Sequence, residues 1–331
     1  MFSTQIKNIN SINKQKYREY CRMHHNLPIF FHPEWLDITT QNGSWDVVIT
    51  MDKADQITGV LPYFLTKKYK RQAILMPPLT PFGGIFITSN HAVKTESQIK
   101  NERQIIQQLI EGLPKDIVFY SQSFYYNFNN WLPFYWQKYH QTTRYSFVID
   151  DLKSWSKDDI ATNIRNKIKK AEKELEIKVL ADPTIVYQQL SDVLQNKGIH
   201  FSLDKKTFLM LDAWLLNNDN RLILGAVDSD GKIYASIYVV FDGDVAYSLM
   251  IGSDLSSRQN GSVPFVIYQA ILEVQKRCKR FDFEGSMLQS LFDLFAGFGG
   301  TMKPYYRIYK AKNLFWDIAY RIKSHYDKSN H

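Results

Sequence analysis

Hydrophobic and polar residues alternate along the chain with two different periods, which together predict a mixed α/β protein. Short strand-like stretches lie at 45–51, 57–65, 72–76, 117–120, 142–149, 221–227, 232–241, 245–251, 281–284 and 305–310, and 281–284 shows the alternation of period two. Apolar residues at helical spacing predict helices at 98–112, 158–175, 183–198, 204–217 and 264–278. Turn sequences at 228–231 and 242–244 are so short that 221–251 is expected to form an antiparallel meander.

The two halves of the chain present the same series of elements. Each has a three-strand meander, a helix, a strand, an irregular or helical piece and a last strand. This order predicts a duplicated architecture, although no repeat is visible at the level of residues. We expect an N-terminal domain at 1–150, a C-terminal domain at 151–312 and a helical tail at 313–331. The predicted fold class is α+β (α/β), with mixed, mostly antiparallel sheets flanked by helices.

Composition narrows the class of protein. The 331 residues are 44% hydrophobic and 15% aromatic, as expected of a globular protein with ordinary cores. A net charge of +8 favours an anionic partner, such as a nucleotide-linked donor, a tRNA or an anionic membrane face, and ordinary solubility explains it equally well. Cys21 and Cys278 form no CxxC pair, and no window has the roughly 18 apolar residues of a membrane span. We therefore expect a cytoplasmic protein without a membrane span, for which peripheral contact with a membrane stays open.

The stretch from 281 to 306 is the centre of the predicted site. Phe281 and Phe283 alternate with Asp282 and Glu284, as in a strand with one packed and one polar face, and the strand breaks at Gly285. Carboxylates at such a strand end lie where open α/β folds place ligands. Asp282 and Glu284 are therefore candidates to position an amine or accept its proton. The alternative is a structural role as partners of nearby lysines.

Three stretches resemble the FemAB-like branch of the GNAT acyltransferase superfamily: 163–173, the turn Asn260-Gly261-Ser262 that leads into 266–274, and 281–286 with the later Phe298-Gly299-Gly300. They cover most of 145–310, whereas 1–145 matches only in layout. The resemblance implies two tandem GNAT-like domains. It also implies transfer of an acyl or aminoacyl group, from acyl-CoA or aminoacyl-tRNA, to an amine of a cell-envelope (peptidoglycan) or sugar-linked precursor.

The chain departs from that family in two places. The pyrophosphate loop of CoA-using members reads Gln/Arg-x-x-Gly-x-Gly/Ala, whereas here Arg258-Gln259-Asn260-Gly261-Ser262 is followed by Val263. The long charged helical pair of some tRNA-dependent members is also missing from the second half. The choice between CoA and tRNA stays open, and we expect no tightly bound cofactor, with acyl-CoA at most a co-substrate.

Basic residues and a helix start are candidates for binding. At 100° per residue, Arg165, Lys169 and Lys173 share one stripe that suits a phosphate or carboxylate; a solvated helix face is the alternative. At Gly261 a strand passes into a helix, whose first amides attract anions. We expect the donor to be bound by Arg258, Asn260, Gly261 and Ser262.

Lys303 and Tyr305 form a second catalytic pair. The lysine would neutralise the oxyanion that forms when an amine attacks an ester or thioester, and the tyrosine would donate a proton to the leaving group. A surface lysine beside a packed tyrosine is the alternative. Tyr247 and Ser286 complete the predicted substrate-binding set with Arg165 and Lys169, although core packing also explains Tyr247.

The sequence contains no motif for metal binding, for a catalytic nucleophile or for nucleotide phosphate binding. The histidines lack metal-ligand spacing and no nucleophile elbow or P-loop occurs, so we expect no metal and direct transfer without a covalent intermediate. The aromatic cluster at 125–136 is interpreted as a base-stacking surface or as a lid between domains. A second hypothesis is a catalytically silent module that binds an anionic ligand or a protein partner through the basic helix at 158–175.

Overall fold

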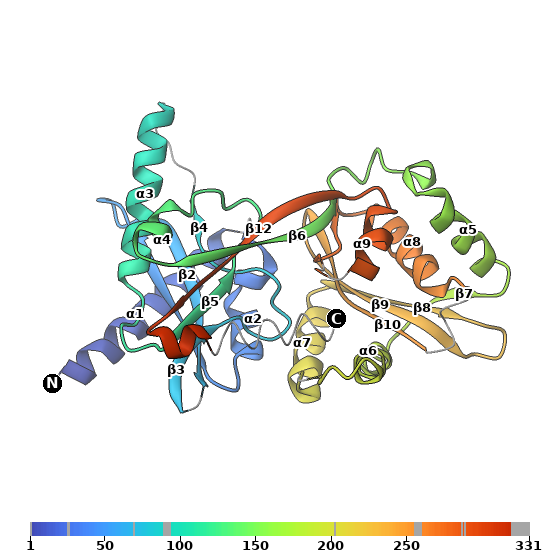
Figure 1. Cartoon of the computed structure of the whole chain (residues 1–331), viewed down its shortest axis with the longest axis horizontal. Helices are drawn as coiled ribbons and strands as arrows, with labels where there is room; N and C mark the ends of the chain where they lie inside the picture. Colours follow the sequence, from blue (N-terminus) through green and yellow to red (C-terminus); the bar gives the residue numbers. More distant parts are fainter. Residues whose placement is uncertain are drawn as a thin grey trace. The chain divides into compact units, whose positions relative to one another are not determined.

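The computed structural model describes residues 2–24, 27–68, 70–88, 94–201, 203–254, 260–285, 287 and 289–318. The described residues form two compact units: unit 1 contains those up to 143 together with 305–318, and unit 2 contains 144–304 (Figure 1). The sequence placed the boundary at 150 and assigned 305–312 to the second domain, whereas the structure groups 305–312 with unit 1.

Unit 1 contains a mixed sheet in the order β1-β2-β3-β5-β12, with β4 paired to β2. Neighbours are antiparallel except β3 and β5, which are parallel. The strands are β1 (Ser44–Met51), β2 (Ile57–Lys68), β3 (Arg71–Leu75), β4 (Phe86–Ile87), β5 (Phe119–Ser123) and β12 (Thr301–Ala311). The helices are α1 (Phe2–Met23), η1 (Ile29–Phe31), α2 (Pro33–Thr39), α3 (Thr95–Glu111) and α4 (Leu132–Trp136).

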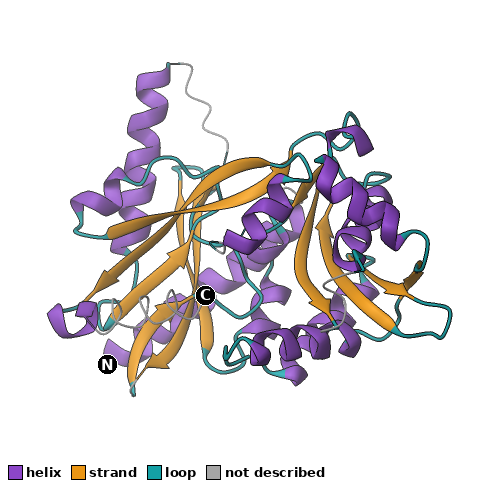
Figure 2. Cartoon of the chain, turned by 45° about the vertical axis from the view of Figure 1, so that its right-hand side comes forward, coloured by secondary structure: helices purple, strands orange, loops and turns teal. Residues whose placement is uncertain are grey.

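Unit 2 repeats this plan in the order β6-β11-β10-β9-β8-β7, with β10 and β11 as its parallel pair. The strands are β6 (His140–Ile149), β7 (Glu176–Val179), β8 (Arg221–Val227), β9 (Ile233–Asp242), β10 (Val245–Ser253) and β11 (Arg280–Asp282). The helices are η2 (Lys157–Asp159), α5 (Thr162–Ala171), α6 (Thr184–Asn196), α7 (Lys205–Asn217), α8 (Ser262–Val274) and α9 (Gln289–Ala296). Figure 2 shows these helices layered against the strands.

The two halves of the chain exchange their closing strands. β12 pairs with β5 in unit 1, where Arg307 lies opposite Ser123, and β6 pairs with β11 in unit 2, where Ile149 lies opposite Phe281. The sequence predicted a mixed, mostly antiparallel sheet flanked by helices, and that prediction is confirmed. It also predicted that 142–149 would close the first repeat and 305–310 the second. That assignment was wrong, because pairing between distant segments leaves no local pattern in the sequence.

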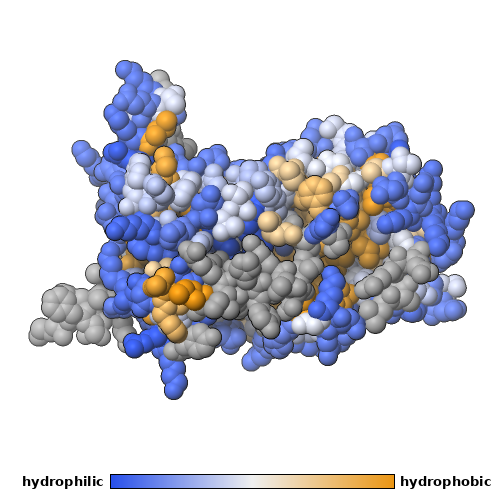
Figure 3. All heavy atoms as spheres, viewed as in Figure 1, coloured by the Kyte–Doolittle hydropathy of each residue, from blue (hydrophilic) through white to orange (hydrophobic). Residues whose placement is uncertain are grey.

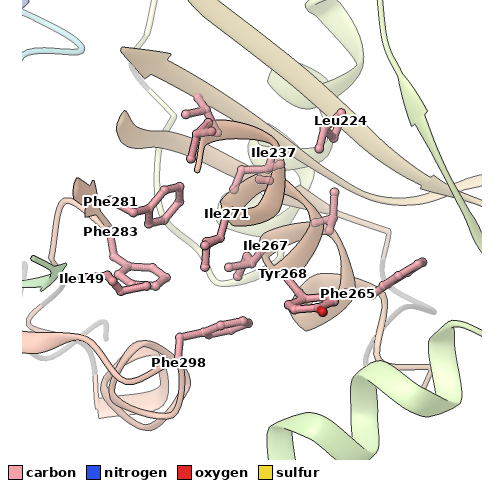
Figure 4. Close-up of a cluster of buried hydrophobic side chains, with 14 of the residues drawn as sticks. Ile149, Leu224, Ile237, Phe265, Ile267, Tyr268, Ile271, Phe281, Phe283 and Phe298 are labelled. Carbon is pink, nitrogen blue, oxygen red and sulfur yellow. The ribbon is translucent and has the colours of Figure 1, made fainter. Parts of the chain in front are cut away.

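The core of unit 2 forms where α5, α8 and α9 pack on one face of the sheet. Phe281 and Phe283 both point into it, beside Ile271 and Phe298 (Figure 4). The two rings contact each other edge to face, with centroids 4.9 Å apart. Both odd-numbered residues of the strand therefore lie in the core, as their period predicts.

The helix start near residue 158 differs from the prediction. Ser156 and Asp159 do form the expected capping box, but it closes only the short 3-10 turn η2. Ile160 and Ala161 then take extended backbone angles, so α5 begins at Thr162. The sequence also missed β7, a short strand with little burial to give it a period. None of the described helices is long and apolar enough to cross a bilayer.

Candidate functional site

The candidate site lies in unit 2, where the pairing between strands β10 and β11 ends. The two strands pair from Val245–Arg280 to Tyr247–Asp282, where β11 ends. β10 is irregular between Ser248 and Met250 and runs on as far as Ser253. Since α8 connects these parallel strands, its N-terminus lies at the same end as their carboxyl ends. Such an end is where open α/β sheets usually bind ligands.

Two acids lie at this end of β11, Asp282 fully buried and Glu284 half-buried. The side chain of Asp282 is fully buried; its Oδ1 accepts hydrogen bonds from the Ser146 hydroxyl and from the Glu284 amide, the latter at 2.8 Å. Asp282 Oδ2 and Glu284 Oε1 are also buried, and neither has a hydrogen-bond partner in the described part of the chain. An unpaired carboxylate is costly in such a place, so at least one of the two oxygens is better protonated or bound to a ligand.

Burial shifts both acids toward their neutral forms. It raises the pKa of Asp282 to about 7, an increase that the hydrogen bond from Ser146 holds back. Burial, and then the negative charge of Asp282, raise the pKa of Glu284 well above its usual value. At neutral pH Asp282 is therefore close to the midpoint of its titration, and the shift at Glu284 favours the neutral form of that acid. A carboxyl in that state is able to accept or give a proton under ordinary conditions.

The backbone beyond Asp282 is held in an unusual path. Glu284 has a φ of 59° and Gly285 a φ of 64°, so two consecutive residues are left-handed. A Cβ on Gly285 would lie 2.1 Å from the carbonyl oxygen of Tyr145, which requires glycine there. For a non-glycine residue such as Glu284 the left-handed region costs about 1–2 kcal/mol. Strain of this kind at a buried acid is typical of a functional position.

The first turn of α8 offers few amides to an anion. The Ser262 amide donates to the side chain of Asn260 at 3.0 Å, and Pro264 has no N–H. Of the first three helical positions, only Val263 has an amide that no hydrogen bond among the described residues uses. The hydroxyl of Ser262 is buried without a partner in this part of the chain. The turn therefore has less anion-binding capacity than an ordinary helix start.

Helix α5 packs directly against this turn. Gly261, the N-cap of α8, has a φ of 76°, and a Cβ on it would lie 2.2 Å from the carbonyl oxygen of Lys167. Arg165 on the same helix is already engaged, because its guanidinium pairs with Asp158 at 3.1 Å. Lys169 is exposed. The structure thus places both predicted basic residues on the helix that touches Gly261, with Lys169 the more available of the two.

Lys303 lies beside another acid of unit 2. Its Nζ is 2.7 Å from Asp150 Oδ2, which also accepts a hydrogen bond from Thr301 at 2.9 Å. The charge of Asp150 is among the causes that raise the pKa of Asp282, so the two acids lie near each other. Sequence reasoning missed Ser146 of β6 and Asp150, which directly follows that strand, since nothing local links β6 to β11.

The two predicted tyrosines are both buried. Tyr247 lies opposite Asp282 in the β10–β11 register and is fully buried, so the structure brings it next to the acids. Tyr305 belongs to unit 1, where its ring packs edge to face on Phe82 with centroids 5.1 Å apart. The remaining predicted site residues lie outside the described part of the chain: Arg258 and Ser286. In that described part, no three potential metal ligands come together.

Comparison with known proteins identifies the fold. No family model and no curated protein matches the sequence. Among solved structures, FemX aligns with a TM-score of 0.60 and 10% identity, covering 88% of this chain and 95% of its own. The C-terminal (DUF2156) domain of a putative lysylphosphatidylglycerol synthetase from Agrobacterium fabrum aligns with a TM-score of 0.51 and 13% identity, covering 92% and 93%. The chain therefore shares the fold of FemX.

Proposed function

We propose that unit 2 transfers an acyl or aminoacyl group from an activated donor to an amine. The observation that carries the proposal is the pair of acids at the end of β11, where its pairing with β10 stops: Asp282 titrates near neutrality, and two buried carboxyl oxygens lack partners among the described residues. An amine is protonated in water and must lose a proton before it attacks a carbonyl. A carboxylate whose pKa is near 7 is matched to that task.

The transfer needs no intermediate that is covalently bound to the enzyme. The Asp282 carboxylate takes a proton from the acceptor ammonium, and the free amine nitrogen then bonds to the carbonyl carbon of the donor ester or thioester. As the bond to the leaving oxygen or sulfur breaks, the carboxyl of Glu284 gives its proton to that group. The Glu284 carboxylate formed in this way takes the second proton of the attacking nitrogen, which leaves a neutral amide. Glu284 therefore ends protonated as it began, and Asp282 loses its proton to solvent.

Lys303 is placed to stabilise negative charge. A lysine ammonium has three N–H donors, and in the described residues Asp150 occupies one of them at 2.7 Å. The others are able to donate to the oxyanion of the tetrahedral intermediate. The poor amide supply at the start of α8 argues against a tightly held pyrophosphate, so we propose that the donor is bound mainly through its acyl or aminoacyl end. The proposed acceptor is an amine of a cell-envelope or sugar-linked precursor.

A transfer assay tests the proposal. Purified protein is incubated with acyl-CoA or aminoacyl-tRNA and a panel of precursor amines, beside the variants Asp282→Asn and Glu284→Gln. Asp293→Asn, an exposed acid on α9, is the matched control. We expect the first two variants to lose about 10²–10⁴-fold in rate and the control to keep full activity. Donor binding without any transfer would refute the enzyme and leave an anion-binding module in its place.

A further inference from the structure

A second surface, in unit 1, combines exposed aromatic side chains with clustered lysines. On the short helix α4, Leu132, Tyr135 and Trp136 occupy positions i, i+3 and i+4, which share one helix face. They are exposed by 50%, 58% and 52%. Single exposed apolar side chains are ordinary, whereas neighbouring ones that form a contiguous patch often mark an interaction site. We call these three residues the α4 patch.

Three lysines border the α4 patch. Lys310 donates a hydrogen bond at 2.8 Å to the carbonyl of Gln137, the residue directly after Trp136. Lys115 and Lys138 are exposed. After burial, their positive charges are the further causes that lower the pKa of Lys310, so the three ammonium groups lie close together. None of them forms an ion pair with an acid among the described residues. A cluster of uncompensated positive charge beside an apolar face is complementary to an anionic partner.

More apolar surface follows Lys310 along the chain. Leu314 and Phe315 are exposed by 71% and 70%. Figure 3 shows hydrophobic atoms gathered on unit 1 near the segment that follows β12. Leu314 and Phe315 are not part of the surface formed by the α4 patch and its lysines, because the adjacent Trp316 packs beside Phe119 on one face of the sheet, whereas Phe134 of α4 packs beside Tyr120 on the other.

We propose that this surface of unit 1 docks on an anionic lipid membrane. Tryptophan and tyrosine rings favour the headgroup level of a bilayer, where one edge is apolar and the other wet. Leu132 favours a bilayer over a nucleic acid, because an aliphatic side chain does not stack on a base as an aromatic ring does but gains from leaving water. The lysines then reach anionic headgroups at the edges of the inserted face.

Vesicle binding by the full chain tests the proposal. Cosedimentation is measured with phosphatidylcholine vesicles with and without phosphatidylglycerol. We expect binding only with the anionic lipid, a loss of about fivefold for each lysine charge removed in Lys115→Gln and Lys138→Gln, and a loss of about tenfold in Trp136→Ser. Ile99→Ser, at a side chain 55% exposed on α3, and Lys53→Gln in the β1–β2 turn are the matched controls and should change nothing.

The same variants separate a membrane from the competing partner. Binding of bulk tRNA is measured by fluorescence anisotropy in parallel. Absence of vesicle binding, equal binding to neutral vesicles, or losses as large in the controls would each overturn the proposal. It would also be overturned if the patch variants weakened tRNA binding while vesicle binding stayed unchanged. Because every substitution is at an exposed residue, the variants are expected to fold normally, and circular dichroism checks this.

Discussion

Replacement of Asp282 by asparagine should make unit 2 more stable above neutral pH. In the unfolded chain this carboxyl has a pKa of 3.8, and burial raises its pKa to about 7 in the folded protein. The cost of the buried charge is therefore absent below pH 3.8, grows as the pH rises to about 7 and is constant above that. At about 1.36 kcal/mol per pH unit the full cost is about 4 kcal/mol at pH 8 and about 2 kcal/mol at pH 5.

Asparagine keeps part of the native arrangement. Its carbonyl oxygen is able to accept the bonds that Ser146 and the Glu284 amide now make to Oδ1. Its NH₂ group replaces Oδ2, which has no partner in the described residues, and leaving that donor unpaired costs about 1–3 kcal/mol at every pH. We therefore expect a net gain of about 1–3 kcal/mol for Asp282→Asn at pH 8. The advantage over wild type should shrink by about 2 kcal/mol at pH 5, independently of the amide's cost.

Urea unfolding of both proteins at the two pH values measures this difference. Asp204→Asn provides a control of opposite sign, because its bonds to the amide and hydroxyl of Thr207 lower the pKa of Asp204. That variant should lose stability at pH 8. If the Asp282→Asn advantage were the same at pH 5 and pH 8, or larger at pH 5, the buried-charge argument would be wrong. Gain of stability together with loss of transfer would mark Asp282 as functional rather than structural.

Further predictions concern the packing of the two units. Gly261→Ala should lower the Tm by several degrees, because its Cβ meets a backbone carbonyl and its φ is 76°; Gly243→Ala, also left-handed but with open space around it, should lower the Tm less. Phe281→Ala should reduce the free energy of unfolding by about 3–5 kcal/mol in urea titrations, since its ring is fully buried. Trp35→Phe should cost about 1–3 kcal/mol by the same measurement, because the buried hydroxyl of Thr80 loses the 2.9 Å bond from the indole N–H. Substitutions without these effects would show that the packing is more adaptable than described.

The sequence predicts local structure well where a single period dominates. The antiparallel meander of β8, β9 and β10 and the helix at α7, with Asp204 as its N-cap, lie within a residue or two of their expected bounds. Alternation at 281–284 correctly put Phe281 and Phe283 in the core. The same alternation predicted a polar face for Asp282, whose side chain is fully buried instead. The alternation of residues along a strand indicates which side chains share a face, but it does not indicate whether another layer of the protein covers that face.

The site was harder to predict because its parts are distant in the chain. The bond from Ser146 to Asp282 joins residues 136 positions apart, and Asp150 pairs with Lys303 from the far end of unit 2. The capping box at Ser156 was visible in the sequence, but the extended residues after it were not. The place where β10 and β11 stop pairing is a property of the assembled sheet rather than of either strand.

The return of β12 to unit 1 constrains how the protein is made. Arg307 donates to the hydroxyl of Ser121 across a separation of 186 residues. At about 5–20 residues per second, a ribosome needs about 9–40 seconds to travel between them. During that interval the edge of β5 that later pairs with β12 has no partner strand, while all of unit 2 is synthesised. An exposed strand edge is a site of misassociation, so the newborn N-terminal half should depend on chaperones more than unit 2 does.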